Sequence, residues 1–439
     1  MKSELPRLLS ECDLDVALVL GPDGMSGANP IFRYLTGVAD HLTGILIVHW
    51  TGRRQLIHGT MERDAARKTG LELINRNRWP MHEILKKYPQ PLEASVEFYR
   101  RIFADLKIHG RVAFYGTGAI GAHHALLQRL QAELPGVEIA CEFERDIFQL
   151  ARETKDAAEI ETMRQVGGAT CQIVAATVKF LQSYEVRDER LVHQDGRPLT
   201  IGEVKNFIRM ETLNRGLEEP EGHIFALGRD AGVPHNVGVA ETPLVLGQTI
   251  VFDIYPRRSG GYYHDMTRTF CLGYAPPEIE RAYRDVLECF EQVVTTLQLG
   301  QPTQTYQLQA CDFFEARGRR TIRSDPKAQS GYIHGLGHGL GLELHEQPSF
   351  PTFGEHPELT LRPGMVFTIE PGLYYPEQGF GIRLEDTYCC DQSGEFHSLT
   401  PYPKELVIPL KAKSSPVSSS RRGSRSQRRA ASPRGGCLF

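Results

Sequence analysis

Five side chains of the kinds that bind divalent metal ions stand in one order in the C-terminal half of the sequence. They are Asp253, Asp265, His338, Glu370 and Glu385. Each lies in a short stretch that is typical of a strand or a tight loop. Four carboxylates in one closed pocket would repel each other unless cations neutralised them. Any one of these segments alone is commonplace, but the five together predict a carboxylate-rich metal centre.

The segments that carry these residues also predict how they meet. Residues 249–270 form two β-rich runs joined by a Gly-Gly turn, so a hairpin would bring the two aspartates side by side. The two glutamates lie in strand-like runs separated by a Pro/Gly-containing loop. Residues 334–346 are too rich in glycine for a helix and bring several imidazoles near one point. Oxygen-rich ligation of this kind favours Mn²⁺, with Co²⁺, Zn²⁺ and Fe²⁺ as alternatives.

These motifs resemble the metallopeptidases of family M24, which have the pita-bread fold and include methionine aminopeptidase, aminopeptidase P and prolidase. The resemblance extends from about residue 150 to about residue 410, and residues 150–163 resemble the first helix of the catalytic domain. It implies that the five residues hold two divalent metal ions, with Asp253 as the bridging aspartate. One departure is that eleven residues separate Asp253 from Asp265, one more than the family pattern. A longer hairpin turn or a bulge would accommodate the extra residue.

The resemblance also implies catalytic roles. Glu370 would take and return the proton of a water that the metal ions activate. His345 and His235 would donate hydrogen bonds where negative charge develops on the scissile carbonyl, each worth roughly 3–4 kcal/mol.

Three further residues have expected places near this centre. Arg383 lies two residues before Glu385 on a probable strand, so both side chains would face the same side. Its guanidinium would either fix an acidic ligand or contact the substrate carboxylate. His334 is expected to line the pocket without binding metal. His264 would point away from Asp265, which predicts a surface or structural role.

We expect three parts along the chain. Residues 1–148 are predicted to form an α/β domain, residues 149–410 an α+β pita-bread catalytic domain, and residues 411–439 a disordered tail. The first part is similar in character to the creatinase-like domain of the family. Its expected strands are 15–20, 44–49, 54–58 and 111–115, and its expected helices are 62–68, 95–106 and 123–134.

One motif in the first part suggests a different function. Gly116, Gly118 and Gly121 form a G-x-G-x-x-G after a strand and before a helix, and Glu142 follows a second strand. This spacing fits the dinucleotide-binding fingerprint. This strand–helix–strand unit comes at the end of its domain, however. No second half follows that could complete a dinucleotide-binding cleft. We therefore interpret the glycines as a plain turn.

Composition is that of a globular protein. Of its 439 residues 41% are hydrophobic and 24% charged, enough for two cores. The first apolar run, 16–20, is far too short for a signal core or a membrane span. Nine cysteines without a Cys-x-x-Cys predict reduced thiols in the cytoplasm. Cys389 and Cys390 are neighbours on an expected strand, so at least one of them should be exposed or lightly packed.

The last 29 residues contain eight basic side chains and no acidic one. Such a segment is expected to be a solvated extension, with weak contact to nucleic acid or anionic lipid as the alternative. Cys437 is third from the end, so the prenylation pattern, which needs the fourth position, does not apply.

Two classes of function follow. The resemblance implies a dinuclear exopeptidase that cleaves short peptides before proline and forms a homodimer. The alternative is a non-catalytic pita-bread protein that binds a partner, but all five ligand positions are filled. Among exopeptidases an Xaa-Pro dipeptidase is favoured over an Xaa-Pro aminopeptidase, and another M24 specificity is a further alternative. Arg383 and the loop 348–357 are expected to help close the far end of the site.

Overall fold

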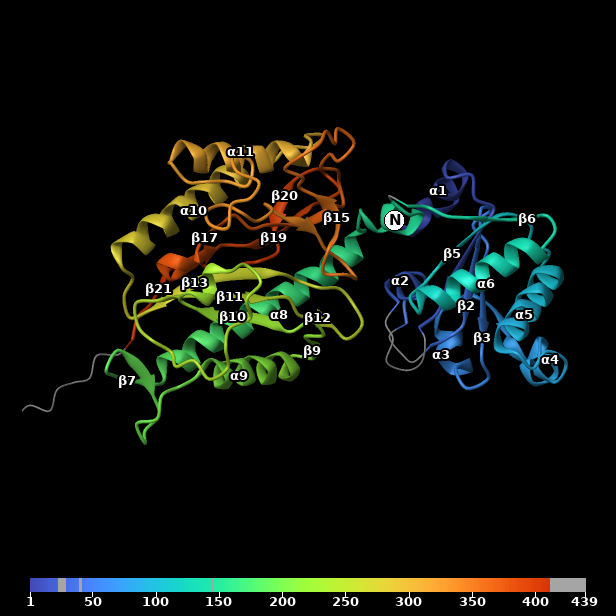
Figure 1. Ribbon diagram of the computed structural model, residues 1–439, viewed down its shortest axis with the longest axis horizontal. Helices are drawn as coiled ribbons and strands as arrows, with labels where there is room; N and C mark the ends of the chain where they lie inside the picture. The colour runs from blue at the N-terminus through green and yellow to red at the C-terminus, as the bar shows by residue number, and fades with distance from the viewer. Residues whose placement is uncertain (23–28, 39–41, 144, 411–439) are drawn as a thin grey trace, which may run out of the picture.

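The computed structural model describes residues 1–22, 29–38, 42–143 and 145–410. They form two lobes, which meet near helices α7 (Ile147–Arg152) and α8 (Ala157–Gln182) (Figure 1). The predicted boundary at residue 148 falls inside α7, Ile147–Arg152, and as a division between folding units it stays a prediction. The predicted disorder of residues 411–439 concerns a segment outside the described residues. Within the described residues, no helix is both long enough and apolar enough to cross a bilayer.

The N-terminal lobe is built on one mixed sheet. Its strands, in order across the sheet, are β4 (Glu72–Asn75), β3 (Arg54–His58), β2 (Ile45–His49), β1 (Val16–Leu20), β5 (Gly110–Tyr115) and β6 (Val137–Ala140). The central strands are nearly continuous apolar runs because helices bury both of their faces. The unit formed by β5, α6 and β6 ends the sheet, as expected for a turn without a second half of a dinucleotide fold.

Helices cover both faces of this sheet. They are α1 (Leu5–Glu11), α2 (Pro30–Thr36), α3 (Arg63–Lys68), α4 (Met81–Lys87), α5 (Pro91–Leu106), α6 (Ile120–Glu133) and α7. Side chains of α4, α5 and α6 pack in one core, and those of α1, α2 and α7 pack in another on the opposite face. The strands and helices predicted here agree with the structure within a few residues. Strand β4 and helices α1, α2 and α4 were not predicted because four to seven residues show little periodicity.

Several small sheets form the centre of the C-terminal lobe. The first has the order β10 (His223–Leu227), β11 (Thr249–Ile254), β13 (Met266–Leu272), β21 (Val407–Ile408). The second has the order β15 (Glu346–Ser349), β14 (His338–Gly339), β16 (Val366–Ile369), β19 (Asp386–Cys390), β20 (Phe396–Ser398). Three pairs complete the lobe: β17 (Gly372–Tyr375) with β18 (Phe380–Arg383), β7 (Glu185–Arg187) with β8 (Arg190–Val192), and β12 (Arg257–Arg258) with β9 (Leu217–Glu218).

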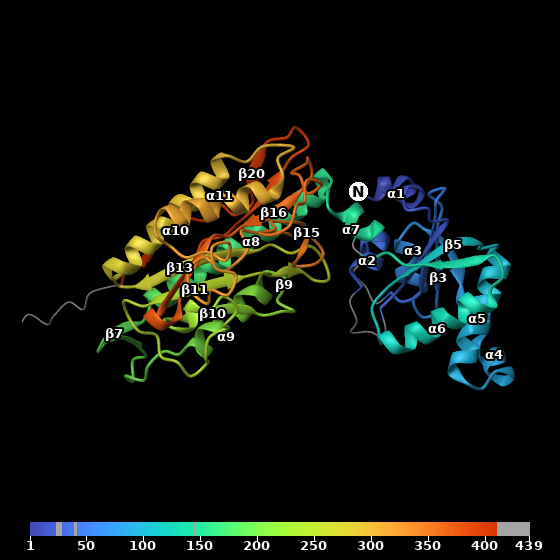
Figure 2. The ribbon, with the colours of Figure 1, turned by 45° about the horizontal axis from the view of Figure 1, so that its top comes forward.

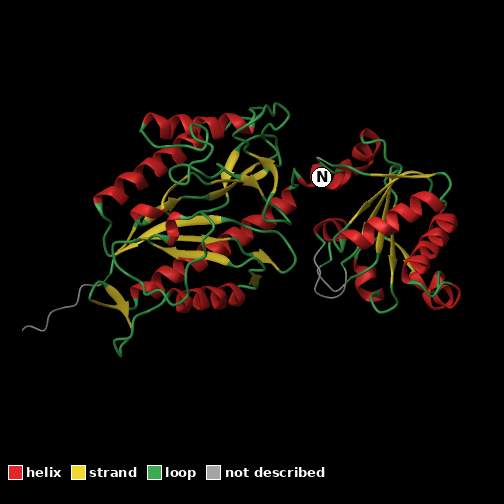
Figure 3. Cartoon of the chain, viewed as in Figure 1, coloured by secondary structure: helices red, strands yellow, loops and turns green. Residues whose placement is uncertain are grey.

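Two pairs of helices enclose these strands. Helices α8 (Ala157–Gln182) and α9 (Ile201–Asn214) lie on one side, and α10 (Pro277–Thr295) and α11 (Thr303–Ala316) on the other (Figures 2 and 3). The helix expected over 150–163 is interrupted between α7 and α8. Asp156 begins α8 because its side chain accepts from the backbone N–H groups of Ala158 and Glu159, each at 2.9 Å.

The cysteines give one correction. Cys389 and Cys390 are both fully buried, so the expectation that one would be exposed or lightly packed is wrong. Strand β19 lies inside its sheet, and its neighbouring residues Tyr388 and Cys389 belong to different core clusters, so both faces of the strand are covered. All eight described cysteines are free.

Candidate metal and active site

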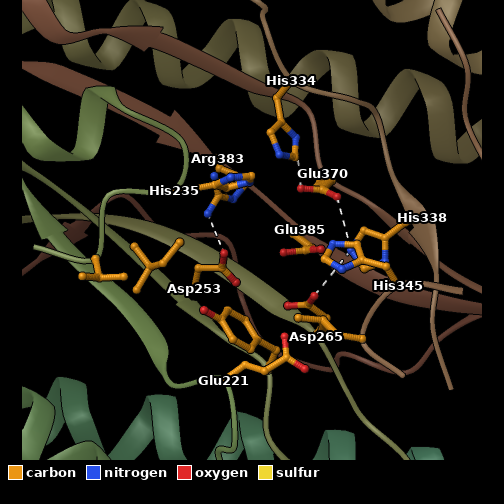
Figure 4. Close-up of a pocket in the computed structure, with 14 residues that line it drawn as sticks. Glu221, His235, Asp253, Asp265, His334, His338, His345, Glu370, Arg383 and Glu385 are labelled. Carbon is orange, nitrogen blue, oxygen red and sulfur yellow. Dashed lines mark hydrogen bonds and ion pairs between the residues drawn. The ribbon is translucent and has the colours of Figure 1, made fainter. Parts of the chain in front are cut away.

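A cavity of about 220 Å³ opens in the middle of the C-terminal lobe, between the first sheet and the loop that carries His334 to His345 (Figure 4). All nine side chains that the sequence singles out line it: His235, Asp253, Asp265, His334, His338, His345, Glu370, Arg383 and Glu385. They come from segments up to 150 residues apart, since His235 and Glu385 share one wall. The structure therefore brings together every residue proposed for the site.

The hairpin that carries the two aspartates is confirmed. Strands β11 and β13 pair antiparallel, with Ile254 opposite Met266. The longer connection contains β12 and a tight turn in which the Gly261 N–H donates to the Arg258 carbonyl at 2.6 Å. The two strands are thus joined by a long hairpin connection. Asp253 and Asp265 are both buried against it.

The histidine and glutamate positions converge on the same point. His338 begins β14, which pairs with β16, and Glu370 follows the last residue of β16. The His338 Nε2 lies 3.6 Å from Asp265 Oδ2 and 3.6 Å from Glu370 Oε1. Ligand atoms of Asp265, His338 and Glu385 all lie within 4.8 Å of one another. This arrangement has the donor types and the closeness that a divalent cation requires.

Several carboxylate oxygens in the pocket have no hydrogen-bond partner in the part of the chain that the structure describes. Asp253 Oδ1, Asp265 Oδ1 and Glu385 Oε1 are buried without a hydrogen-bond partner among the described residues. Burial raises the pKa of Asp265 well above its ordinary value, and the carboxylates of Asp253 and Glu370 raise it further. Burial also raises the pKa of Glu385 well above its ordinary value, and the carboxylate of Asp265 raises it further. Buried anions in this state require cations, so the residues present fit a site for divalent metal ions.

Glu370 differs from the other carboxylates. Burial opposes its charged form, but His334, His338 and Arg383 outweigh burial and lower its pKa. The His334 Nδ1 lies 3.4 Å from Glu370 Oε2, and His334 lines the cavity beside it. Glu370 is therefore ionised near neutral pH, which is the state that a proton acceptor needs.

Threonine hydroxyls hold two of the acidic residues in place, one through its side chain and one through its backbone. Thr267 donates to Glu385 Oε2 at 2.8 Å, and Thr387 donates to the Asp265 carbonyl at 2.8 Å. The sequence reasoning missed these threonines. A signal was available, because Thr267 stands two residues after Asp265, and Thr387 two residues after Glu385, where strand alternation returns side chains to one face.

Arg383 is buried, and all three nitrogens of its guanidinium donate hydrogen bonds to protein groups. Its Nη2 donates to Asp253 Oδ2 at 2.5 Å, its Nη1 to the Tyr374 hydroxyl at 2.8 Å and its Nε to Thr267 Oγ1 at 3.0 Å. Of the two expected roles, this geometry favours holding an acidic side chain over contact with the substrate carboxylate, through which Arg383 was expected to help close the far end of the site. The loop 348–357, expected to share that task, packs on α11, where Thr303 donates to the Ser349 carbonyl at 2.7 Å. It contributes no residue to the cavity lining.

The remaining histidines fall into two groups. His235 packs edge-on against His334 with ring centroids 5.5 Å apart, and His345 lies 4.2 Å from the His338 ring. Burial and the neighbouring His338 lower the pKa of His345, so it is neutral at physiological pH. His264 is fully buried behind the hairpin, and burial lowers its pKa to about 3. Its Nε2 contacts Thr400 Oγ1 at 3.2 Å, so of the two roles expected for it the structural one holds.

Five further residues complete the cavity wall and were not singled out as site residues: Glu221, Ile224, Val237, Tyr255 and Leu344. Four of them are apolar or aromatic. Glu221 is the exception, because it adds a fifth carboxylate. Its surroundings in the sequence, Glu218, Glu219 and Pro220, look like an ordinary solvated turn, so no local signal marks it.

Comparisons with known proteins agree with this geometry. The model of the family described as metallopeptidase family M24 matches residues 161–392. The chain is 32% identical to an Xaa-Pro dipeptidase of Pyrococcus furiosus over 193 residues, which cover 44% of this chain and 51% of that protein. The chain spans about half the length of several curated relatives that it matches.

Solved structures resemble nearly the whole chain. An Xaa-Pro dipeptidase from Bacillus anthracis superposes with a TM-score of 0.70 at 21% identity, covering 92% of this chain and 98% of that one. An X-Pro aminopeptidase from Thermotoga maritima superposes with a TM-score of 0.68 at 22% identity, covering 90% of this chain and 97% of that one. At this identity the likeness establishes the fold, with an α/β N-terminal lobe and a pita-bread C-terminal lobe.

Proposed function

This chain belongs to metallopeptidase family M24, and we propose that it is a metal-dependent exopeptidase that hydrolyses the bond before proline in short peptides. The observation that carries the proposal is the cluster of buried carboxylate oxygens without partners, flanked by imidazoles, in one cavity. A cavity that only bound a partner would have no reason to hold this cluster. Family membership implies divalent ions, and the five residues proposed as ligands all line the cavity.

We propose that Asp253, Asp265, His338, Glu370 and Glu385 hold two divalent ions. When bound, these ions would supply an activated water and polarise the scissile carbonyl. Glu370 takes the proton of the attacking water, because its flanking histidines keep it ionised, and passes that proton to the leaving amine. His345 and His235 donate hydrogen bonds to the oxygen on which negative charge develops. Arg383 keeps Asp253 in position through the 2.5 Å contact.

Within this class, we propose an Xaa-Pro dipeptidase and keep Xaa-Pro aminopeptidase as the second candidate. Relatives and structural neighbours of both names support the class, and the two activities differ in the space beyond proline. The apolar and aromatic part of the cavity lining, Ile224, Val237, Tyr255 and Leu344, suits a pyrrolidine ring or an aliphatic side chain.

The test is mass spectrometry of peptides incubated with metal-stripped protein, with and without added Mn²⁺. The peptides are Ala-Pro, Ala-Pro-Ala and Ala-Ala-Ala. Metal-dependent release of proline from Ala-Pro alone supports a dipeptidase, and conversion of Ala-Pro-Ala to Ala and Pro-Ala supports an aminopeptidase. Glu370→Gln is the matched control, and it should retain the fold while losing turnover. A wild-type protein that cleaves none of them with any metal would refute the enzyme assignment.

We also propose Mn²⁺ as the native ion, a homodimer and a cytoplasmic location. The oxygen-rich donor set supports Mn²⁺, and the eight free cysteines support a reducing compartment. Elemental analysis of protein purified without added metal tests the ion, and light scattering on a sizing column tests the dimer. Contact between the basic tail and nucleic acid is a weaker proposal, which a salt-dependent gel shift would test.

A further inference from the structure

Glu221 stands apart from the other acidic groups of the cavity. It belongs to the short connection between β9 and β10, and it lines the cavity mouth with its side chain exposed. It is not one of the five proposed metal ligands. In Figure 4 it lies at one end of the site and His334 at the other, with Asp265, Glu385 and Glu370 between them. Its carboxylate therefore faces substrate space next to the reacting centre.

Its neighbours in sequence are already paired, whereas Glu221 is not. Glu218 accepts from Arg257 Nε at 2.8 Å, and Glu219 contacts His223 Nδ1 at 2.9 Å. No described residue forms an ion pair with Glu221. Its one hydrogen-bond partner in the described part of the chain is the Tyr263 hydroxyl, which donates to Oε1 at 3.1 Å.

The hydrogen bond from Tyr263 orients the carboxylate of Glu221. The tyrosine ring is buried, and burial raises the pKa of the hydroxyl to about 12, so it remains a hydrogen-bond donor at neutral pH. The Tyr263 backbone N–H donates to the Gly341 carbonyl at 2.8 Å, which fixes the tyrosine to the loop that carries His345. One oxygen of Glu221 is thereby held, and the other remains available to a ligand.

The two ends of the cavity differ in their side chains. The imidazoles of His235 and His334 and the guanidinium of Arg383 lie together at one end, and Glu221 lies at the other (Figure 4). A free dipeptide is also asymmetric, with an ammonium group on the residue before the scissile bond and a carboxylate after it. We propose that Glu221 binds an ammonium group on the substrate residue that precedes the scissile bond. This inference rests on the proposed function, since it takes the cavity to be the peptide site.

Two ammonium groups could fill this role, the α-amino group and the side chain of a lysine at the same residue. The test measures kcat and KM for Ala-Pro, Lys-Pro and lactyl-proline, in which a hydroxyl replaces the α-amino group, in the metal-loaded full chain. The variant is Glu221→Gln. The matched control is Glu241→Gln, because Glu241 is exposed and lies outside the cavity. We expect KM to rise roughly 5- to 30-fold in Glu221→Gln with kcat nearly unchanged, as loss of one charge contact predicts.

The pattern across substrates identifies the group. An equal rise for Ala-Pro and Lys-Pro, with lactyl-proline unaffected, assigns the contact to the α-ammonium. A rise confined to Lys-Pro assigns it to the side-chain ammonium and makes Glu221 a determinant of preference for basic residues. KM values that match the Glu241→Gln control for all three substrates overturn the inference. A fall in kcat at constant KM also overturns it, because it would mean that Glu221 acts on His345 through Tyr263.

A binding measurement separates this inference from the proposed activity. Calorimetric titration of Ala-Pro and Lys-Pro into Glu370→Gln protein, with and without Glu221→Gln, compares affinities without turnover. If the wild-type chain hydrolyses nothing, the proposed function fails, and a loss of affinity in the double variant still supports the ammonium site. Equal affinities in the two proteins overturn it.

Discussion

The buried carboxylates of the cavity should lower the free energy of unfolding of the metal-free protein. A single isosteric substitution can measure the size of this effect. We predict that Asp265→Asn stabilises the metal-free protein by about 1–2 kcal/mol at neutral pH. Asp265 is 4% exposed, one of its oxygens has no partner, and Asp253 and Glu370 lie near it. Asparagine keeps the shape of the side chain and removes the charge that burial and these neighbours oppose.

The pH dependence follows from the direction of the pKa shift. Burial raises the pKa of Asp265 in the folded protein above its ordinary value of 3.8. Between 3.8 and the folded pKa, the folded carboxyl holds a proton that the unfolded chain has released. Stability of the metal-free wild type therefore falls as pH rises through that window. The advantage of Asp265→Asn is absent at low pH, grows across the window and is complete above it.

The assay is urea and thermal unfolding of chelator-treated protein between pH 4 and pH 8. The control is Asp386→Asn, because Asp386 is equally buried but contacts Arg268 at 2.8 Å and also Lys404. Removing its charge should destabilise the protein by about 3–5 kcal/mol. Added Mn²⁺ should stabilise the wild type by about 2.7 kcal/mol at a concentration 100-fold above Kd, and Asp265→Asn far less. Destabilisation by both asparagines in the metal-free state would refute the reasoning.

Three further predictions follow from individual contacts. Arg383→Met leaves Asp253 buried without its cation, so urea unfolding should show a loss of about 3–5 kcal/mol, and titration a weaker affinity for Mn²⁺. Leu342→Ala should cost about 2–5 kcal/mol and lower kcat at unchanged metal content, because Leu342 packs in the N-terminal core three residues before His345. Glu203→Gln should lower Tm above about pH 4.5. The pKa of Glu203 is lowered from 4.5 to about 2 by Arg197, so its contribution is lost as pH falls through that range and the two proteins should converge near pH 2.

Short-range spacing carried most of what could be predicted about the site. Asp253 and Asp265 were expected to meet because a hairpin is a local structure, and His338 lies in a run whose glycines exclude a helix. Contacts between segments that are distant in the sequence leave no comparable pattern in the sequence. Leu342 sits in the same glycine-rich segment, yet its side chain enters the core of the other lobe. The surroundings of Glu221 resemble a solvated turn, and only the fold shows that it faces the cavity.

The failed expectation for Cys389 and Cys390 has the same origin. Alternation along a strand assigns one residue to each face, but it does not say what covers each face. The sheets of this lobe are enclosed by helices on both sides, so neighbouring residues are buried in different cores. Burial of both thiols is thus a property of the layers and not of the local sequence.

The alternation of side chains between the two faces of a strand also explains how this lobe can bury so many acidic residues. Glu385 lines the cavity and accepts a hydrogen bond from Thr267, whereas Arg268 and Asp386, the next residues along the same chain segments, pair with each other away from the cavity. On that reverse side Arg268 donates to the Glu385 carbonyl at 2.8 Å and to Asp386 Oδ1 at 2.8 Å. The strands thus separate the acidic groups of the cavity face, three of whose oxygens have no partner among the described residues, from the Arg268–Asp386 pair on the other face. A shift of register by one residue would exchange the two sets, leaving Arg268 in the cavity and Asp265 in the core. The buried ion pair behind the site therefore favours the register that places the proposed metal ligands, which is a separate role from any net stabilisation it provides.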